Sequence, residues 1–240
     1  MNQQHAFVRR EGSAPGVVEP RVVELEMSYR LMKNYNYLVI DPVARQAVVV
    51  DPAWEIGKVD QALDDAGATL AGILITHSHA DHVHLAKPLS EKYGCPIFMS
   101  EEEIAVSGFD ASRLIAIDDR RLVVGGISIE PIFTPGHTPG CMCYLIGEHL
   151  FTGDVLFAEG CGMCPDVEAA QAMYFSLQRL KSRVGPQTRV YPGHSYGKPP
   201  GQTMSQLLKD NIYLHFKNKD SFAAFRMRSG QNRAKMLSFG

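Results

Sequence analysis

The chain comprises 240 residues, of which 45% are hydrophobic and 21% are charged, and its formal net charge is −2. This length and composition predict one globular domain with a large core. No apolar run approaches the roughly 18 residues of a membrane span, and the charge balance is slightly acidic, which argues against membrane and nucleic-acid partners. The first ten residues lack the apolar segment of a secretory signal, and the five cysteines are an odd number, so we expect a cytoplasmic protein.

Hydrophobic periodicity and turn residues divide the chain into predicted elements. Residues 1–20 are polar, which predicts a mobile N-terminal tail before a catalytic domain at 21–200. In chain order, that domain is predicted to contain strands at 22–27, 37–40 and 47–50, helices at 57–66 and 83–93, and short strands between Pro96 and Asp154.

Two helical regions are predicted in the last third of the chain. Asp166 is the expected N-cap of a helix that runs to Ser182, in which Met173, Leu177 and Leu180 form a stripe facing the core. Residues 201–240 are predicted to form a C-terminal helical extension of the same domain.

One short segment points directly to a metal. The sequence His77-Ser-His-Ala-Asp-His82 follows the apolar run 70–76, so alternation along a strand sends His77 and His79 to the same side. Asp81 and His82 follow where the chain turns into a helix, and they can point to a second position. A lone histidine on an apolar strand is usually a core residue, but burying this cluster unpaired would cost several kcal/mol for the carboxylate alone. The segment therefore predicts half of a two-metal site.

Three further candidate ligands follow predicted strands later in the chain. His137 lies in a Pro- and Gly-rich loop, Asp154 closes the apolar run 150–154, and His194 closes the run 190–194. A single aspartate after a strand is more often a cap or turn former. Taken together with the first cluster, the set brings five histidines and two aspartates to strand ends, enough for two metals with one bridging carboxylate.

The pattern His-x-His-x-Asp-His, followed by His, Asp and His, resembles the ligand pattern of the metallo-β-lactamase superfamily. This resemblance implies a four-layer αβ/βα sandwich, in which two mixed sheets face each other with helices outside. It implies two zinc ions per chain, and iron or manganese suits the same ligands. By resemblance, the first position uses His77, His79 and His137, the second uses Asp81, His82 and His194, and Asp154 bridges them.

Within the superfamily, the chain is most similar to the glyoxalase II branch, through the segments 76–82, 151–154, 159–162 and 191–194. Glutathione-handling relatives have Arg after Gly-Cys-Gly, whereas Met163 stands there in this chain. The stretch 160–164 is more similar to zinc-dependent hydrolases associated with polyketide biosynthesis, which act on acyl groups held by pantetheine thiols or carrier proteins. Two alternatives stay open: an ordinary hydroxyacylglutathione hydrolase, and a mononuclear iron persulfide dioxygenase with the same ligand pattern.

Resemblance and leaving-group chemistry together predict a zinc-dependent thioester hydrolase. Bound zinc lowers the pKa of water to about 7, which would supply hydroxide for attack on a polarised carbonyl. A thiol with a pKa of about 8.5 can leave as thiolate without a general acid, and the ligand loops contain no extra acid. Asp81 is the predicted catalytic residue, because its free carboxylate oxygen can orient the hydroxide. Asp51 is a candidate acceptor for the N–H of a ligand histidine.

The expected substrate is a small-molecule thioester or an acyl-carrier protein. Residues 209–240 contain seven Lys and Arg against two Asp, so this segment carries +5 and the remainder −7. That asymmetry favours an anionic thiol carrier, although a solvated helical surface explains it equally well. We expect the cysteines to pack in the core as small apolar side chains. The oligomeric state stays open. The candidate substrate contacts are Cys161, Met163, Tyr196, Arg226 and Arg228.

Overall fold

The structure of the chain is a computed structural model that describes residues 19–30 and 32–229. Most of the predicted N-terminal tail lies outside the described residues, as do Arg233 and Lys235 of the basic C-terminal segment. The strands are β1 (Arg21–Tyr29), β2 (Met32–Asp41), β3 (Gln46–Val50), β4 (Thr69–Leu74), β5 (Ile97–Ser100), β6 (Leu114–Ile117), β7 (Leu122–Val124), β8 (Ile127–Phe133), β9 (Met142–Ile146), β10 (His149–Gly153), β11 (Arg189–Pro192) and β12 (Gln202–Thr203). The helices are α1 (Ile56–Ala66), α2 (Ala80–Val83), α3 (Ala86–Tyr93), α4 (Glu101–Ser107), α5 (Val167–Arg183), α6 (Met204–Asp210), the 3-10 helix η1 (Ile212–Leu214) and α7 (Lys219–Arg226).

The strands form two six-stranded mixed sheets, with the orders β1-β2-β3-β4-β5-β6 and β12-β11-β10-β9-β8-β7. In the first sheet β3, β4, β5 and β6 run parallel to one another, and in the second β10 and β11 are parallel. Parallel neighbours place their carboxyl ends at the same edge of a sheet, which is where α/β proteins commonly build their sites. The predicted ligand loops follow the carboxyl ends of β4, β10 and β11.

Alternation along the strands gives each sheet two buried faces. In β3, Ala47 and Val49 belong to an outer apolar cluster, while Val48 and Val50 belong to an inner one. In β10, Leu150 faces outward in the same way and Phe151 faces inward. Because the side-chain period of a strand is two, each sheet can pack against helices on one side and against the other sheet on the other.

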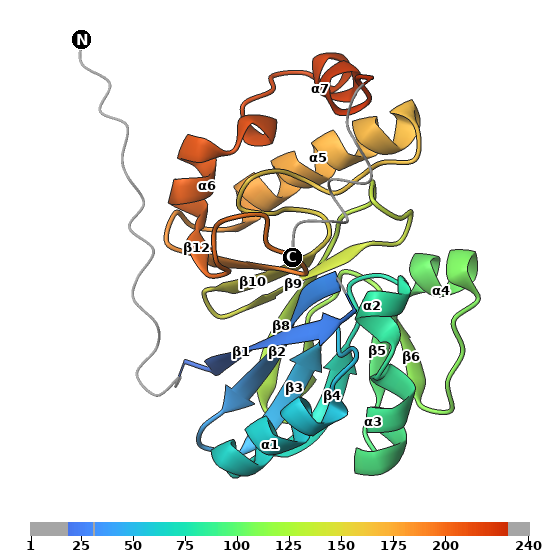
Figure 1. The fold of residues 1–240 in the computed structure, drawn as a ribbon, viewed down its shortest axis with the longest axis vertical. Helices are drawn as coiled ribbons and strands as arrows, with labels where there is room; N and C mark the ends of the chain where they lie inside the picture. Colours follow the sequence, from blue (N-terminus) through green and yellow to red (C-terminus); the bar gives the residue numbers. More distant parts are fainter. Residues whose placement is uncertain (1–18, 31, 230–240) are drawn as a thin grey trace.

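Helices cover the two outer faces of this sheet pair (Figure 1). Helices α1 and α3 pack on the first sheet, and α5 with the C-terminal helices packs on the second. Met173, Leu177 and Leu180 of α5 are fully buried, and the Asp166 carboxylate accepts a hydrogen bond from the N–H of Ala169 at 2.8 Å. The predicted four-layer αβ/βα sandwich and the predicted helix after Asp166 are therefore confirmed.

One prediction of local structure holds only in part, and another was wrong. The predicted helix at 83–93 is interrupted, because α2 ends at Val83 and α3 begins at Ala86. The interruption lets the N–H of buried Leu85 donate to the carbonyl of Pro52 at 2.9 Å, a tertiary contact that outweighs helix continuity. Helix α4 lies where only short strands were predicted, and its seven residues are too few to show helical periodicity.

The segment after residue 200 shares the core of the second sheet. Strand β12 pairs antiparallel with β11. Leu214 of η1 and Phe222 of α7 are buried in the same cluster as Leu177 of α5. Among the described residues, no helix has the length and apolar character needed to cross a bilayer.

Candidate metal centre

The residues predicted as metal ligands meet at one edge of the sandwich. The segment from His77 to His82 follows β4 of the first sheet. His137 follows β8, Asp154 follows β10, and His194 follows β11 of the second sheet. The two sheets therefore approach a common site from opposite sides, and the strand ends position the side chains.

His77, His79 and His137 form a first group of ring nitrogens. Nε2 of His77 lies 3.0 Å from Nδ1 of His79, and Nε2 of His137 lies 3.1 Å from the same Nδ1 atom. Ligands at about 2.0–2.1 Å from a tetrahedral zinc lie roughly 3.3 Å from one another, so this spacing fits one metal held by three imidazoles. His77 is buried and His79 is exposed, which opens the group to solvent on the side of His79.

Asp81, His82 and His194 form a second group. Oδ2 of Asp81 lies 3.2 Å from Nε2 of His194 and 3.7 Å from Nε2 of His82. Asp154 lies between the two groups: its Oδ1 is 3.5 Å from Nε2 of His82, and its Oδ2 is 3.6 Å from Nε2 of His137. This is the position that a carboxylate bridging two metals would occupy.

Two buried polar atoms in this centre have no hydrogen-bond partner, namely Nε2 of His82 and Oδ1 of Asp154. Buried polar atoms are rarely left unpaired, because an unmet donor or acceptor is costly away from water. A cation between them would satisfy both atoms. Imidazole and carboxylate ligands suit zinc, iron and manganese alike, so the residues present fit a pair of such metals.

Hydrogen bonds hold the second nitrogen of most of these imidazoles, which leaves Nε2 directed into the centre. The Nδ1 contacts are His77 with Oγ1 of Thr76 (3.0 Å), His82 with Oδ2 of Asp51 (2.9 Å), His137 with the carbonyl of Met163 (2.8 Å) and His194 with the carbonyl of Lys33 (2.8 Å). The predicted role of Asp51 as an acceptor beside a ligand histidine is confirmed. Asp51 also accepts hydrogen bonds from the N–H and Oγ1 of Thr76, at 2.7 and 2.6 Å.

The electrostatic environment favours the protonation state of a metal ligand at His77 and Asp154 and opposes it at His82. Burial lowers the pKa of His77 well below its ordinary value, and the neighbouring imidazoles lower it further. Burial alone would raise the pKa of Asp154, but the imidazoles of His194 and His82 hold it below its ordinary value. Burial would lower the pKa of His82, yet the carboxylates around it, Asp154 first, raise it to about 9. A metal must therefore displace a proton from His82 at neutral pH.

Close backbone approach explains the glycine that precedes His194. A Cβ atom at Gly193 would lie 2.5 Å from Cε1 of His82 and 2.8 Å from Oδ1 of Asp154. Both distances are shorter than real contacts of a Cβ atom, so the loop after β11 can approach the other ligands only with glycine at this position.

The sequence model of the "Metallo-beta-lactamase superfamily" matches residues 33–194, a span that contains every candidate ligand. The chain belongs to the metallo-β-lactamase superfamily. It is 46% identical over 212 residues to the "Probable polyketide biosynthesis zinc-dependent hydrolase BaeB" of Bacillus velezensis, with 88% of this chain and 94% of that protein covered. It is 36% identical over 207 residues to the hydroxyacylglutathione hydrolase of Pelagibacter ubique, with 82% and 81% covered. The crystal structure of ETHE1 from Myxococcus xanthus has a TM-score of 0.76 at 27% identity and covers 90% of this chain and 94% of its own.

Two of the predicted substrate contacts of this superfamily member lie beside the metal centre. The ring of Tyr196 is half-buried, with its centroid 5.1 Å from that of Phe157 and 6.4 Å from that of His194. Burial raises the pKa of Tyr196, and the carboxylates of Asp154 and Asp81 raise it further, so the phenol stays protonated. Met163 contributes through its backbone, because its carbonyl is the partner of His137.

The other predicted contacts lie elsewhere than expected. Cys161 is 2% exposed and packs in the core, and burial raises the pKa of its thiol. Its contact with substrate stays a prediction. All five cysteines are buried and free, as the expectation of packing in the core requires. Arg226 is 4% exposed and its Nε donates to the carbonyl of Gly162 at 2.8 Å, so it is not part of an exposed basic surface. Arg228 is exposed and lies over the ring of Phe225 at 3.7 Å.

Sequence reasoning missed three buried polar residues around the centre. Nδ2 of Asn34 donates to the carbonyl of Asp81 at 2.6 Å, and Nδ2 of Asn36 donates to the carbonyl of Asp51 at 2.6 Å. Glu103 contacts both loops that carry the first ligand group. The repeated Asn-Tyr pairs at 34–37 were a usable signal, since asparagine is uncommon in strands. Nothing local to Glu103 distinguished it from the two glutamates before it.

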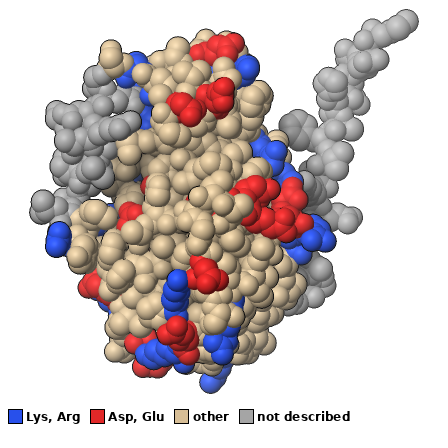
Figure 2. All heavy atoms as spheres, turned by 90° about the vertical axis from the view of Figure 1, so that its right-hand side faces the viewer, with Lys and Arg blue, Asp and Glu red and all other residues tan. Residues whose placement is uncertain are grey.

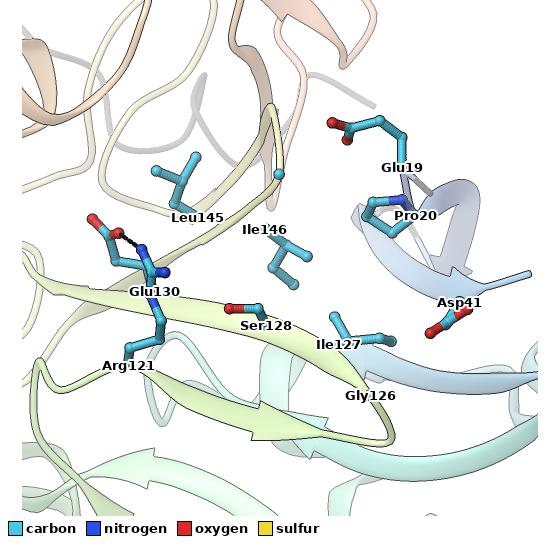
Figure 3. A pocket seen from close by; sticks show the side chains of 11 residues that line it. Glu19, Pro20, Asp41, Arg121, Gly126, Ile127, Ser128, Glu130, Leu145 and Ile146 are labelled. Carbon is cyan, nitrogen blue, oxygen red and sulfur yellow. Dashed lines mark hydrogen bonds and ion pairs between the residues drawn. The ribbon is translucent and has the colours of Figure 1, made fainter. Parts of the chain in front are cut away.

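A separate cavity of about 320 Å³ lies at the opposite end of the strands (Figure 3). Its lining includes Gly126 in the turn before β8, Gly147 in the turn before β10, and Asp41 at the end of β2. Arg121 beside it is paired with Glu130 at 3.0 Å. No candidate ligand lines this cavity, so the metal centre and the cavity are distinct features.

Proposed function

We propose that this superfamily member is a zinc-dependent hydrolase of thioesters whose thiol is a pantetheine arm, either free or on an acyl-carrier protein. The observation that carries the proposal is the convergence of five imidazoles and two carboxylates on two adjacent positions, with Nε2 of His82 and Oδ1 of Asp154 buried and unpaired. A centre with this donor set suits the two zinc ions per chain that we expect.

Zinc bound in such a centre would supply a Lewis acid and make water nucleophilic near neutral pH. The carboxylate of Asp81 can accept a hydrogen bond from the attacking water and aim it. Burial would raise the pKa of Asp81, but His194 and His82 hold it below its ordinary value, so the carboxylate is ionised at neutral pH. Tyr196, which stays protonated, can donate its O–H to an oxygen of the substrate.

Leaving-group chemistry favours a thioester over an amide. A thiol has a pKa of about 8.5 and departs as a thiolate, whereas an amine must be protonated as it leaves. We assign no general acid among the loop residues, apart from the weakly acidic phenol of Tyr196. The ligand set therefore supports cleavage of a bond whose leaving group can depart without being protonated.

The choice of a pantetheine thiol over glutathione rests on Met163 and on the relatives. Met163 stands where glutathione-handling relatives have Arg. The relative at 46% identity carries a name from polyketide biosynthesis, and the hydroxyacylglutathione hydrolase stands at 36%. Surface charge contributes less to this choice of thiol carrier, because acidic and basic side chains lie in small mixed groups on the face shown in Figure 2. Arg228 and Lys217 are exposed cations of the C-terminal segment that an acidic carrier could meet.

A substrate panel tests this proposal on zinc-loaded protein. We expect an S-acyl pantetheine or acyl-carrier thioester to have a higher kcat/KM than S-lactoylglutathione. We also expect it to exceed the matching amide by at least about 100-fold, since general acid catalysis typically contributes about 10²–10⁴-fold. His194→Ala should abolish turnover, and His215→Ala, which changes a histidine outside both ligand groups, should preserve it.

Two outcomes would replace the proposal. Faster hydrolysis of S-lactoylglutathione would make the chain a hydroxyacylglutathione hydrolase. Oxygen uptake with glutathione persulfide, without thioester cleavage, would make it a persulfide dioxygenase with one iron.

A further inference from the structure

Glu103 is a buried carboxylate that lies between two of the ligand loops. It is 1% exposed, although it belongs to the first turn of α4 and follows two exposed glutamates. Its Oε1 accepts hydrogen bonds from the N–H and the Oγ of Ser78, at 2.8 and 2.6 Å. Its Oε2 accepts from Oγ1 of Thr138 at 2.6 Å and from the N–H of Gly140 at 3.1 Å.

These contacts bind one carboxylate to residues that adjoin all three histidines of the first group in the chain. Ser78 lies between His77 and His79, and Thr138 directly follows His137. The first loop comes from the first sheet and the second loop from the second sheet. Glu103 therefore adds a side-chain link between two segments that the backbone also joins, through the N–H of Met142 and the carbonyl of Thr76 at 2.9 Å.

The capping of α4 does not explain this arrangement. The N-cap of the helix is Ser100, whose Oγ accepts from the N–H of Glu103 at 3.0 Å and donates to the carbonyl of Gly140. A Cβ atom at Gly140 would lie 2.1 Å from the backbone nitrogen of Glu103, so this loop rests directly on the start of the helix. Because Ser100 caps the helix, the Glu103 side chain is available to accept hydrogen bonds from the two loops.

The Glu103 carboxylate is buried among neutral hydrogen-bond donors. Among residues 19–30 and 32–229, no Lys or Arg forms an ion pair with it; its partners there are the hydroxyl and amide donors of the two loops. A buried ionised carboxylate without a counter-charge is costly unless its oxygens are fully hydrogen-bonded. Both oxygens of Glu103 are satisfied in this way.

We propose that Glu103 is a positioning residue for the first metal position, which it assembles by holding the loop of His77 and His79 against the loop of His137. This inference rests on the metal centre proposed above. It predicts that loss of the carboxylate weakens one of the two metal positions, whereas a general loss of stability would affect both.

The test compares Glu103→Gln with Glu101→Gln, which changes an exposed glutamate in the same helical turn. The glutamine amide keeps one acceptor oxygen but directs an NH₂ group at the donors of one loop. We expect zinc titration against a competing chelator to show one equivalent bound about 10–100-fold more weakly, with the other unchanged, and Glu101→Gln to match the wild type. The visible spectrum of the cobalt-loaded protein should change for Glu103→Gln alone.

Unchanged zinc affinity in folded Glu103→Gln would overturn the inference, as would equal weakening of both equivalents. Wild-type protein that takes up no metal would instead overturn the metal centre itself. If Glu103→Gln does not fold, the variants Thr138→Val and Thr138→Ser test the inference in its place. Thr138→Val removes one hydrogen-bond donor to Glu103 and should weaken the binding of one zinc equivalent. Thr138→Ser keeps the hydroxyl and should bind that equivalent as tightly as the wild type. Failure of that difference would equally contradict the role of Glu103.

Discussion

At the scale of single residues, the metal centre depends on which nitrogen of each imidazole is free. His82 shows the principle most clearly, because its Nδ1 faces the carboxylate of Asp51 at 2.9 Å and its Nε2 is buried without a partner. A carboxylate can only accept, so it keeps the proton of a neutral His82 on Nδ1 and leaves Nε2 as the ligand atom.

We expect Asp51→Asn to weaken zinc binding by about 10–100-fold. The amide NH₂ can donate to Nδ1 of His82, which favours the imidazole with its proton on Nε2, the wrong form for a ligand. Chelator competition measures the affinity, and Asp64→Asn, an exposed aspartate of α1, is the matched control. Equal affinity in the two variants would show that Asp51 does not set the proton position of His82.

At the scale of elements, the C-terminal segment supports the centre through the loop at 157–164. Nδ2 of Asn211 donates to the carbonyls of Phe157 and Gly160 at 3.0 Å each. Arg226 of α7 donates to the carbonyl of Gly162, and the next residue of that loop presents its carbonyl to His137. The basic segment therefore contributes a buried cation to loop structure as well as exposed cations at its surface.

Two arginines of this region provide a matched pair of variants. We expect Arg226→Gln to lower the free energy of unfolding by about 2–3 kcal/mol, because it removes a charge-assisted hydrogen bond from a buried carbonyl. Exposed Arg228→Gln should stay within about 0.5 kcal/mol of the wild type. Urea unfolding monitored by circular dichroism distinguishes the two. Equal effects would argue against a structural role for Arg226, and Arg228 remains the cleaner position for testing carrier binding.

At the scale of the whole molecule, the candidate ligands connect the two sheets. The first sheet supplies the loop from His77 to His82, and the second supplies His137, Asp154 and His194. Between the sheets lies an apolar cluster to which both contribute, including Tyr37, Leu74, Tyr144 and Phe151. Bound metals would therefore add cross-links at one edge of a sandwich whose interior is already packed.

We expect metal removal to lower the melting temperature by about 10 °C without unfolding the chain at room temperature. A ligand at 1,000 times its Kd stabilises by about 4 kcal/mol, and 1 kcal/mol shifts Tm by about 2–4 °C at this chain length. Scanning calorimetry before and after chelation, with elemental analysis for about two metals per chain, measures the effect. Re-addition of zinc should restore Tm, and a Tm indifferent to chelation would contradict the proposed centre.

Local patterns were sufficient to single out the candidate ligands and to predict several elements. His77, His79, Asp81 and His82 stand within six residues, and the Pro- and Gly-rich turns around His137 and His194 mark strand ends, so each signal lies in a short stretch. Helix α5 could be predicted in the same way, because Asp166 is a typical N-cap residue and the buried residues Met173 and Leu177 are spaced at the helical period. These features depend on neighbours in the chain, which is why the sequence by itself determined them.

Only the tertiary structure decided what supports those ligands. Glu103 meets Thr138 across 35 positions, Asn34 meets Asp81 across 47, and Arg226 meets Gly162 across 64. At each of these positions the sequence shows an ordinary polar residue, because burial and partner come from segments brought together by the packing of two sheets. The break between α2 and α3 has the same origin in the contact of Leu85 with Pro52. Ligand identity is a local property of this chain, whereas ligand orientation is a property of the fold.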